Sequence, residues 1–153
     1  MLLNEFINLY LILEGRIEDE VSKEEFLKFA KDKDWHVRAS IAKNSETPKE
    51  ILEILSKDEN LNIRISVAEN PNISKDIFEI LAKDKNWTVR ASVAENTKTP
   101  KEIIEILAKD EKHWIRALVA KNSETPKEIL EVLAKDEEPY VRKAVIQNPN
   151  YKK

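Results

Sequence analysis

Apolar side chains along the chain recur at helical spacing in short stretches that polar residues separate. In 35–43 and 49–57, a projection at about 100° per residue gathers them on one side of each stretch. We expect the inward side of the first stretch to hold Val37, Ser40 and Ile41. The inward side of the second stretch consists of Ile51, Leu52, Ile54 and Leu55. Each unit therefore predicts two short helices, each with one buried side.

The pair of stretches repeats with a period of 26 residues. Helices of about ten residues are not stable alone, so each must bury its apolar side against its neighbours. Periodic helix pairs of this length predict a solenoid of stacked units. We expect a single all-α domain over 1–153. Its parts are a divergent N-terminal capping unit at 1–31, repeats at 32–57, 58–83, 84–109 and 110–135, and a partial repeat with a C-terminal cap at 136–153.

Polar residues mark where each helix begins. Asp34, Asn60 and Asn86 precede the first helix of their units, where an N-cap is favoured, and Pro139 occupies a first helical position. "TPKE" at 47–50, 99–102 and 125–128 predicts a Thr N-cap, a Pro in the first turn and a capping box, with the helix running through Lys57 or its equivalent. In the second unit Ile73 replaces Thr, which leaves Ser74 as the expected cap.

Three polar positions are the same in all five units. The Asp position holds Asp32, Asp58, Asp84, Asp110 and Asp136; the Arg position holds Arg38, Arg64, Arg90, Arg116 and Arg142; the Asn position holds Asn44, Asn70, Asn96, Asn122 and Asn148. A guanidinium beside an apolar seam needs a carboxylate, so we expect a structural Arg–Asp ladder within or between units. An anion or phosphate track is the alternative. Asn after a helix predicts a left-handed residue whose amide binds loop backbone.

The outward side of the first helices is unexpectedly apolar. Positions 35, 36, 39 and 43 and their equivalents should face water, yet all three Trp residues of the chain lie among them. The candidate partner-binding residues are Trp35, His36, Leu61, Ile65, Trp87, His113, Trp114 and Tyr140. One interpretation is an exposed binding surface. The other is that these side chains fold over the adjacent loop or the next repeat.

Each unit reads D-x5-R-x5-N followed by T-P-K-E-I-L-x-I-L-A-K-D or a close version of it. This pattern, over 32–148, resembles the leucine-rich repeat variant family, which is related to HEAT and armadillo repeats. The resemblance implies a right-handed α-α superhelix. A namesake member carries a cysteine-bound iron–sulfur cluster, but this chain has no Cys and cannot bind one in that way.

Composition narrows the classes of function. The absence of Cys excludes disulfides and thiol chemistry, and the single Gly, Gly15, argues against a fold rich in tight turns. The net charge of −3 arises within 1–31, and the remaining residues are balanced, which disfavours nucleic acid as a partner. His36 and His113 lie in different repeat positions of different units. We expect no catalytic residues, no metal and no cofactor.

The capping unit has its own features. Residues 2–14 predict an apolar helix that ends at Gly15, too short to span a membrane. Either this helix is deeply covered or it buries a second chain, which would give weak self-association. Ser22 and Glu25 predict a capping box, and Phe26 and Phe29 match Leu52 and Leu55.

Together these features favour a non-enzymatic cytoplasmic scaffold that binds a protein or peptide on its concave face. The first alternative is DNA or RNA binding through Arg, Lys and Trp, as in HEAT-like DNA-binding proteins. The second is a structural repeat without a dedicated partner. A Cys-free composition rich in Lys, Glu and Ile is also typical of thermophile proteins.

Overall fold

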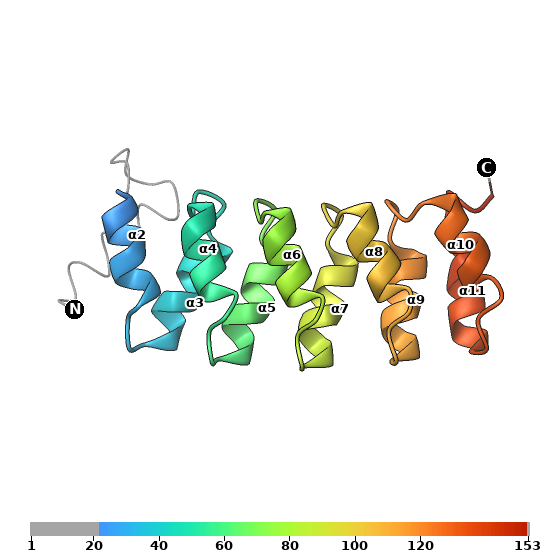
Figure 1. The fold of residues 1–153 in the computed structure, drawn as a ribbon, viewed down its shortest axis with the longest axis horizontal. Coiled ribbons are helices and arrows are strands. Elements are labelled where there is room, and N and C mark those ends of the chain that lie inside the picture. Colours follow the sequence, from blue (N-terminus) through green and yellow to red (C-terminus); the bar gives the residue numbers. More distant parts are fainter. Residues whose placement is uncertain (1–21, 153) are drawn as a thin grey trace.

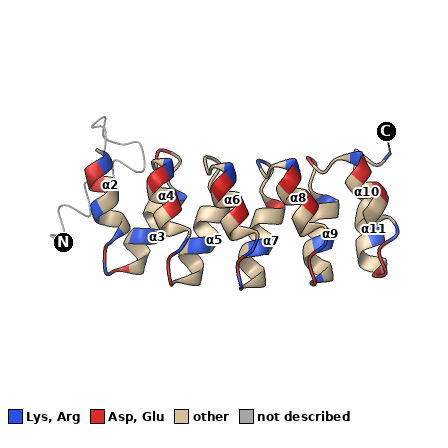
Figure 2. Ribbon diagram, in the orientation of Figure 1, with Lys and Arg blue, Asp and Glu red and all other residues tan. Residues whose placement is uncertain are grey.

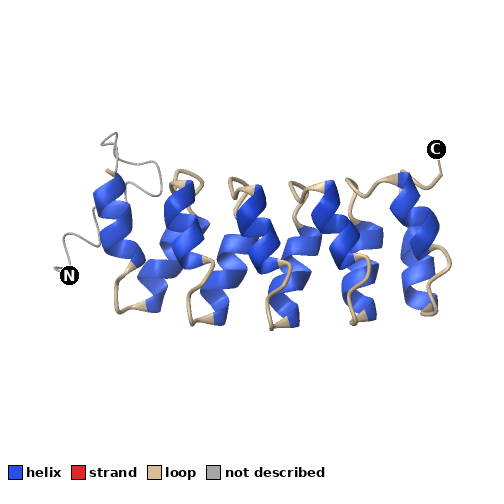
Figure 3. Cartoon of the chain, viewed as in Figure 1, coloured by secondary structure: helices blue, strands red, loops and turns tan. Residues whose placement is uncertain are grey.

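The computed structural model describes residues 22–152, and in this part of the chain all regular structure is helical (Figure 3). The helices are α2 (Lys23–Ala30), α3 (Trp35–Lys43), α4 (Lys49–Leu55), α5 (Leu61–Glu69), α6 (Lys75–Leu81), α7 (Trp87–Glu95), α8 (Lys101–Leu107), α9 (His113–Lys121), α10 (Lys127–Leu133) and α11 (Pro139–Gln147). The equivalent helices α3, α5, α7, α9 and α11 begin 26 residues apart. The predicted all-α solenoid of two-helix repeats is confirmed. The helix expected at 2–14, its end at Gly15 and the connection at 16–21 lie outside the described residues.

The helices form two rows along the long axis of the molecule (Figure 1). The long-helix row comprises α3, α5, α7, α9 and α11, and each of its helices contacts the next one in the row. The short-helix row comprises α4, α6, α8 and α10, which contact the long helices before and after them. Helices α2 and α11 lie at opposite ends (Figure 1). Each unit is therefore held mainly by its sequence neighbours.

The core runs continuously between the two rows. Val37, Ile41, Leu52 and Leu55 are buried as predicted, and the equivalent residues of the other units extend the same cluster. Phe26 and Phe29 of α2 are buried at the positions that match Leu52 and Leu55, which confirms that correspondence. The stacked units thus share one apolar core, and each inner unit packs against a neighbour on both sides.

Some inward positions were predicted wrongly. Ile54 and Ile106 are exposed, because seven-residue α4 and α8 bury only a narrow stripe. In α3 the outward expectation for position 39 is wrong as well: Ala39 is buried, whereas Ser40 is exposed. Small side chains at this position lie buried again in α7 and α9, at Ala91 and Ala117. We attribute this to close approach of the long helices, since interaxial distance depends on the side chains at the contact.

The helix starts follow the predictions only in part. Asp34, Asn60 and Asn86 each accept a hydrogen bond from the backbone N–H two residues later, and Pro139 opens α11, as expected. Ser22 forms the predicted capping box with Glu25, and Ser74 caps α6.

The prediction for "TPKE" is wrong. Thr47 makes no cap, and its Oγ1 instead donates a 2.6 Å hydrogen bond to the carbonyl of Ile41. Pro48 lies before the helix in an extended conformation, so it is not the first helical residue. The helix then ends at Leu55 rather than Lys57. Each Thr of this kind therefore joins the two helices of its unit.

Candidate functional site

The outward side of the long-helix row carries the predicted aromatic residues. We define the aromatic face as Trp35, His36, Leu61, Ile65, Trp87, His113, Trp114 and Tyr140. They occupy the first turns of their helices, except Ile65, which lies one turn further on. Asx caps fix the starts of α3, α5 and α7: Asn86 Oδ1 accepts from the N–H of Thr88, so α7 begins at Trp87 with its indole outside the core.

The four aromatic rings other than imidazole are substantially exposed. Trp35 is 37% exposed, Trp87 and Trp114 are each 47% exposed, and Tyr140 is 51% exposed. Leu61 and Ile65 are half-buried and pack against the core, so they contribute less free surface. The ring surfaces thus remain accessible to a second molecule, while the aliphatic pair between Trp35 and Trp87 is partly used by the fold.

Neighbouring rings contact one another. The centroids of Trp87 and Trp114, which come from adjacent units, are 6.4 Å apart with a 57° angle between the planes. Within units, the rings of His113 and Trp114 are 4.2 Å apart, and those of Trp35 and His36 are 3.8 Å apart. His36 Nδ1 lies 3.0 Å from the carboxylate of its N-cap, Asp34. Contacts of this kind restrict the orientations of the indoles.

Charged residues on the first four long helices are few: each carries the Arg of the repeat near its middle and one charged residue at its end. The ribbons of α3, α5, α7 and α9 are mostly uncharged, whereas α4, α6, α8 and α10 carry both signs (Figure 2). The last residues of the first four long helices are Lys43, Glu69, Glu95 and Lys121. Lys121 Nζ donates a 2.9 Å hydrogen bond to the Tyr140 hydroxyl, and this ammonium lowers the pKa of Tyr140.

The Arg and Asp positions form bidentate pairs across unit boundaries. Arg38 Nε and Nη2 donate to the carboxylate of Asp58, the Asp of the next unit, at 2.8 and 3.2 Å. Its Nη1 donates to the carbonyl of Asp32 in its own unit, at 2.7 Å. Equivalent pairs join Arg64 to Asp84, Arg90 to Asp110 and Arg116 to Asp136. Each of these guanidinium groups therefore binds the carboxylate of the next unit and a backbone carbonyl of its own unit. It is not free to bind an anion.

These pairs shift the ionisation of their members. The side chains of Arg116 and Asp136 are almost fully buried. Hydrogen bonding to Arg116 lowers the pKa of the Asp136 carboxyl, and hydrogen bonding to Asp110 raises the pKa of Arg90. Arg142 differs, because it keeps only its bonds to the carbonyls of Asp136 and Glu137 and has no carboxylate partner among the described residues.

The Asn residues at the ends of α5, α7, α9 and α11 also form hydrogen bonds across the boundaries between units. Asn122 Nδ2 donates to the carbonyls of Ala94 and Asn96 in the preceding unit, at 2.8 and 3.3 Å. Its Oδ1 accepts from the N–H of Glu124. Asn70, Asn96 and Asn148 make the same bonds. The expected left-handed conformation is wrong: these residues are extended, with φ of −72 to −62°.

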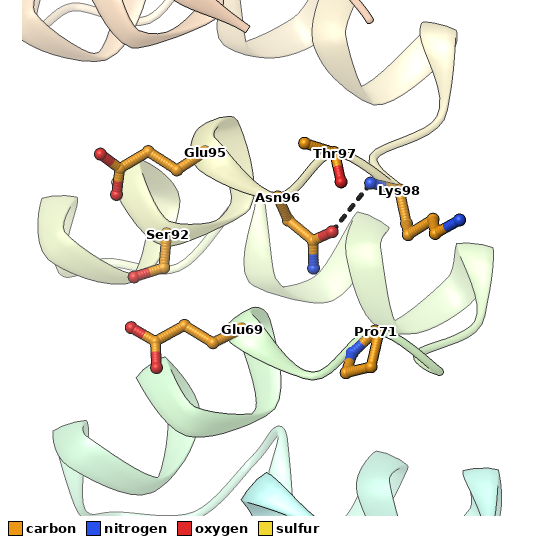
Figure 4. Close-up of a pocket in the computed structure, with 7 residues that line it drawn as sticks. All are labelled: Glu69, Pro71, Ser92, Glu95, Asn96, Thr97 and Lys98. Carbon is orange, nitrogen blue, oxygen red and sulfur yellow. Dashed lines mark hydrogen bonds between the residues drawn. The ribbon is translucent and has the colours of Figure 1, made fainter. Parts of the chain in front are cut away.

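A pocket that the sequence does not predict lies between α5 and α7. It has a volume of about 310 Å³ and is lined by Glu69, Pro71, Ser92, Glu95, Asn96, Thr97 and Lys98 (Figure 4). The helices bring together two carboxylates that are 26 residues apart in the chain. The only sequence signal is that the central two units have Glu where the flanking units have Lys.

Residues that could bind a metal do not gather in the described part of the chain. Within 22–152, no group of three or more His, Cys, Asp or Glu side chains is placed to hold an ion. None of the described helices is long and apolar enough to cross a membrane.

Comparison with known proteins supports the helical-repeat fold. A solved structure described as a leucine-rich repeat variant with a novel repetitive structural motif superimposes with a TM-score of 0.64 at 28% sequence identity. The alignment covers 90% of this chain and 60% of that protein, so the chain spans less than two thirds of its length. The resemblance to the leucine-rich repeat variant is confirmed. No family model matches the sequence, and no curated protein matches it.

Proposed function

We propose that this leucine-rich-repeat-variant-like solenoid is a non-enzymatic scaffold that binds a protein or peptide through its aromatic face. The observation that carries the proposal is the contact between Trp87 and Trp114, two half-exposed indoles from adjacent units. In the predicted superhelix this row would form the concave side.

The chemistry of these rings favours a protein partner. Trp and Tyr are enriched among interface residues whose truncation costs about 2 kcal/mol or more. They bury much surface at a low cost in side-chain entropy, and here their neighbours already restrict them. A partner side chain that packs against the Trp87–Trp114 pair would cover apolar surface that water now contacts.

Nucleic acid fits the same surface less well. Binding to a phosphate backbone requires free Arg and Lys, but Arg38, Arg64, Arg90 and Arg116 are each paired with an Asp. The two central helices end in Glu69 and Glu95, which would repel a phosphate backbone that crosses them. The residues therefore support a polypeptide partner over DNA or RNA.

Selection of peptides from a random phage-displayed library on the immobilised protein tests the proposal. A synthetic copy of an enriched peptide should bind the wild type and lose about tenfold or more in affinity to Trp87→Ala/Trp114→Ala. The matched control is Ile106→Ala/Val132→Ala, which removes exposed apolar side chains from the short-helix row. Circular dichroism establishes that both variants are folded. No enriched peptide, or equal losses in both variants, would overturn the proposal, whereas a salt-sensitive affinity for single-stranded DNA would favour the alternative.

A further inference from the structure

Three of the polar side chains that line the pocket between α5 and α7 lie on one side of it (Figure 4). The carboxylates of Glu69 and Glu95 come from the last residues of the two helices, and the hydroxyl of Ser92 lies between them (Figure 4). All three side chains point to the same side of the pocket (Figure 4). The arrangement places hydrogen-bond acceptors from two units around one opening.

Ser92 behaves differently from the equivalent residues of earlier units. Ser40 Oγ and Ser66 Oγ donate to the carbonyls of His36 and Asn62, one turn back in their helices. Ser92 makes no such bond to Thr88, nor any other side-chain hydrogen bond within the described residues, although the residue is only 9% exposed. The hydroxyl oxygen itself is accessible to solvent, because no side-chain N or O atom of the described residues is both buried and without a hydrogen-bond partner. This oxygen is thus available to a group that enters the pocket.

The two carboxylates also lack a cation. On the short-helix row, Glu50 and Glu102 accept from Lys23 and Lys75 of the preceding unit. Glu69 and Glu95 have no ion pair with any described residue. Lys98, which lines the pocket, points away from them (Figure 4), and the ammonium of Lys121 binds Tyr140 instead. The pocket therefore presents uncompensated negative charge.

We propose that the pocket binds an Arg side chain of the partner polypeptide. A planar guanidinium can donate to two carboxylates and still offer an N–H to the Ser92 oxygen. A calcium ion requires six to eight oxygen ligands, more than these three side chains supply. This inference rests on the proposed function, because it specifies the chemistry of the polypeptide that the aromatic face binds.

The pocket and the aromatic face both use residues of α7. Glu95 lies eight residues after Trp87 in α7, so the two residues are about 12 Å apart along the helix axis. In an extended peptide, about three to four residues span this distance. The partner segment therefore carries an apolar side chain on Trp87 and an Arg three or four residues from it.

The library selection described above also tests this inference. Enriched peptides should contain an apolar residue and an Arg at that spacing. Glu69→Gln/Glu95→Gln should lower the affinity for the selected peptide by about tenfold to a hundredfold, because each charged hydrogen bond is replaced by a weaker neutral one. The control Glu105→Gln/Glu131→Gln makes the same charge change on exposed positions of the short-helix row and should have little effect.

A double-mutant cycle separates this inference from the proposed function. The Arg→Gln analogue of the peptide should bind wild type and Glu69→Gln/Glu95→Gln with equal affinity. A peptide that depends on Trp87 and Trp114 but is insensitive to Glu69→Gln/Glu95→Gln would overturn the Arg pocket and leave the scaffold function standing. Loss of the dependence on the two indoles would overturn both.

Discussion

At the residue scale, the junctions between units depend on charge pairs that are nearly sealed from water. Breaking a buried pair by removing one member costs more than a surface pair is worth, because the remaining charge stays desolvated. Arg90 and Asp110 form such a pair, with atoms 2.6 Å apart, whereas Arg142 has only carbonyl partners among the described residues. The chain thus contains its own matched comparison.

Arg90→Met should lower the free energy of unfolding by about 3 kcal/mol. Arg142→Met should lower it by about 1 kcal/mol, since it removes only hydrogen bonds to backbone carbonyls. Urea unfolding followed by circular dichroism measures both. Equal losses would show that the carboxylate adds nothing to the junction.

Acid should weaken the same ladder through Asp136. Its pKa is lowered in the folded protein by Arg116, so folding gains stability from this carboxylate above its unfolded pKa of about 3.9. That contribution is lost as the pH falls through the folded pKa. Asp136→Asn should therefore be less stable than wild type at pH 7, and the difference should narrow between about pH 5 and pH 3. Urea midpoints across this range check it, and a constant difference would contradict it.

At the element scale, hydrogen bonds join the ends of α5, α7, α9 and α11 to the unit before them. The buried amide of Asn122 donates to two carbonyls there, while Asn44 Nδ2 has no acceptor among the described residues. Both residues keep an Oδ1 that accepts from a loop N–H. The two positions therefore differ chiefly in the inter-unit bonds.

Asn122→Asp should cost about 2 kcal/mol or more, because the new oxygen faces the carbonyls of Ala94 and Asn96 without a donor. Asn44→Asp should change stability by no more than about 0.5 kcal/mol. Thermal unfolding at neutral pH distinguishes the two. A similar loss at both positions would mean that the Asn contribution is local to its own loop.

The sequence predicted the elements better than their contacts. Helix 35–43 and the caps at Asp34 and Ser22 follow from local patterns, and the structure confirms them. Thr47 could not be assigned correctly, because "TPKE" fits a capping Thr as well as one that donates across the unit. The repeat spacing allowed the Asp partner of Arg38 to come from its own unit or from the next one. The pocket that Ser92 lines depends on how α5 and α7 pack together. Both depend on three-dimensional register, which spacing along the chain does not specify.

At the scale of the whole molecule, stability is a sum over units and the junctions between neighbours. All four complete junctions use the same atoms, since each Arg reaches an Asp 20 residues later. Removing 84–109 would place Asp110 where Asp84 now pairs with Arg64. The shortened chain should therefore rebuild an equivalent junction.

A variant without 84–109 should fold with high helix content and a lower unfolding midpoint, because it loses one junction. A variant without 84–96 should lose most of its helical signal. This deletion removes α7 and leaves two short helices in succession, so the later helices no longer match the two rows. Far-ultraviolet circular dichroism with urea titration compares the two. Similar unfolding of both deletions would contradict the equivalence of the junctions.

The directional pairing of guanidinium to following carboxylate has a bearing on ancestry. A genetic exchange between misaligned copies of the coding segment would add or remove a stretch of 26 codons. The new boundary in the product would have the same Arg–Asp pair as the others. We therefore expect a chain of this kind to tolerate the gain or loss of whole units, because the junctions between its units stay the same. A chain whose neighbouring segments used a different partner at each boundary would have no such freedom.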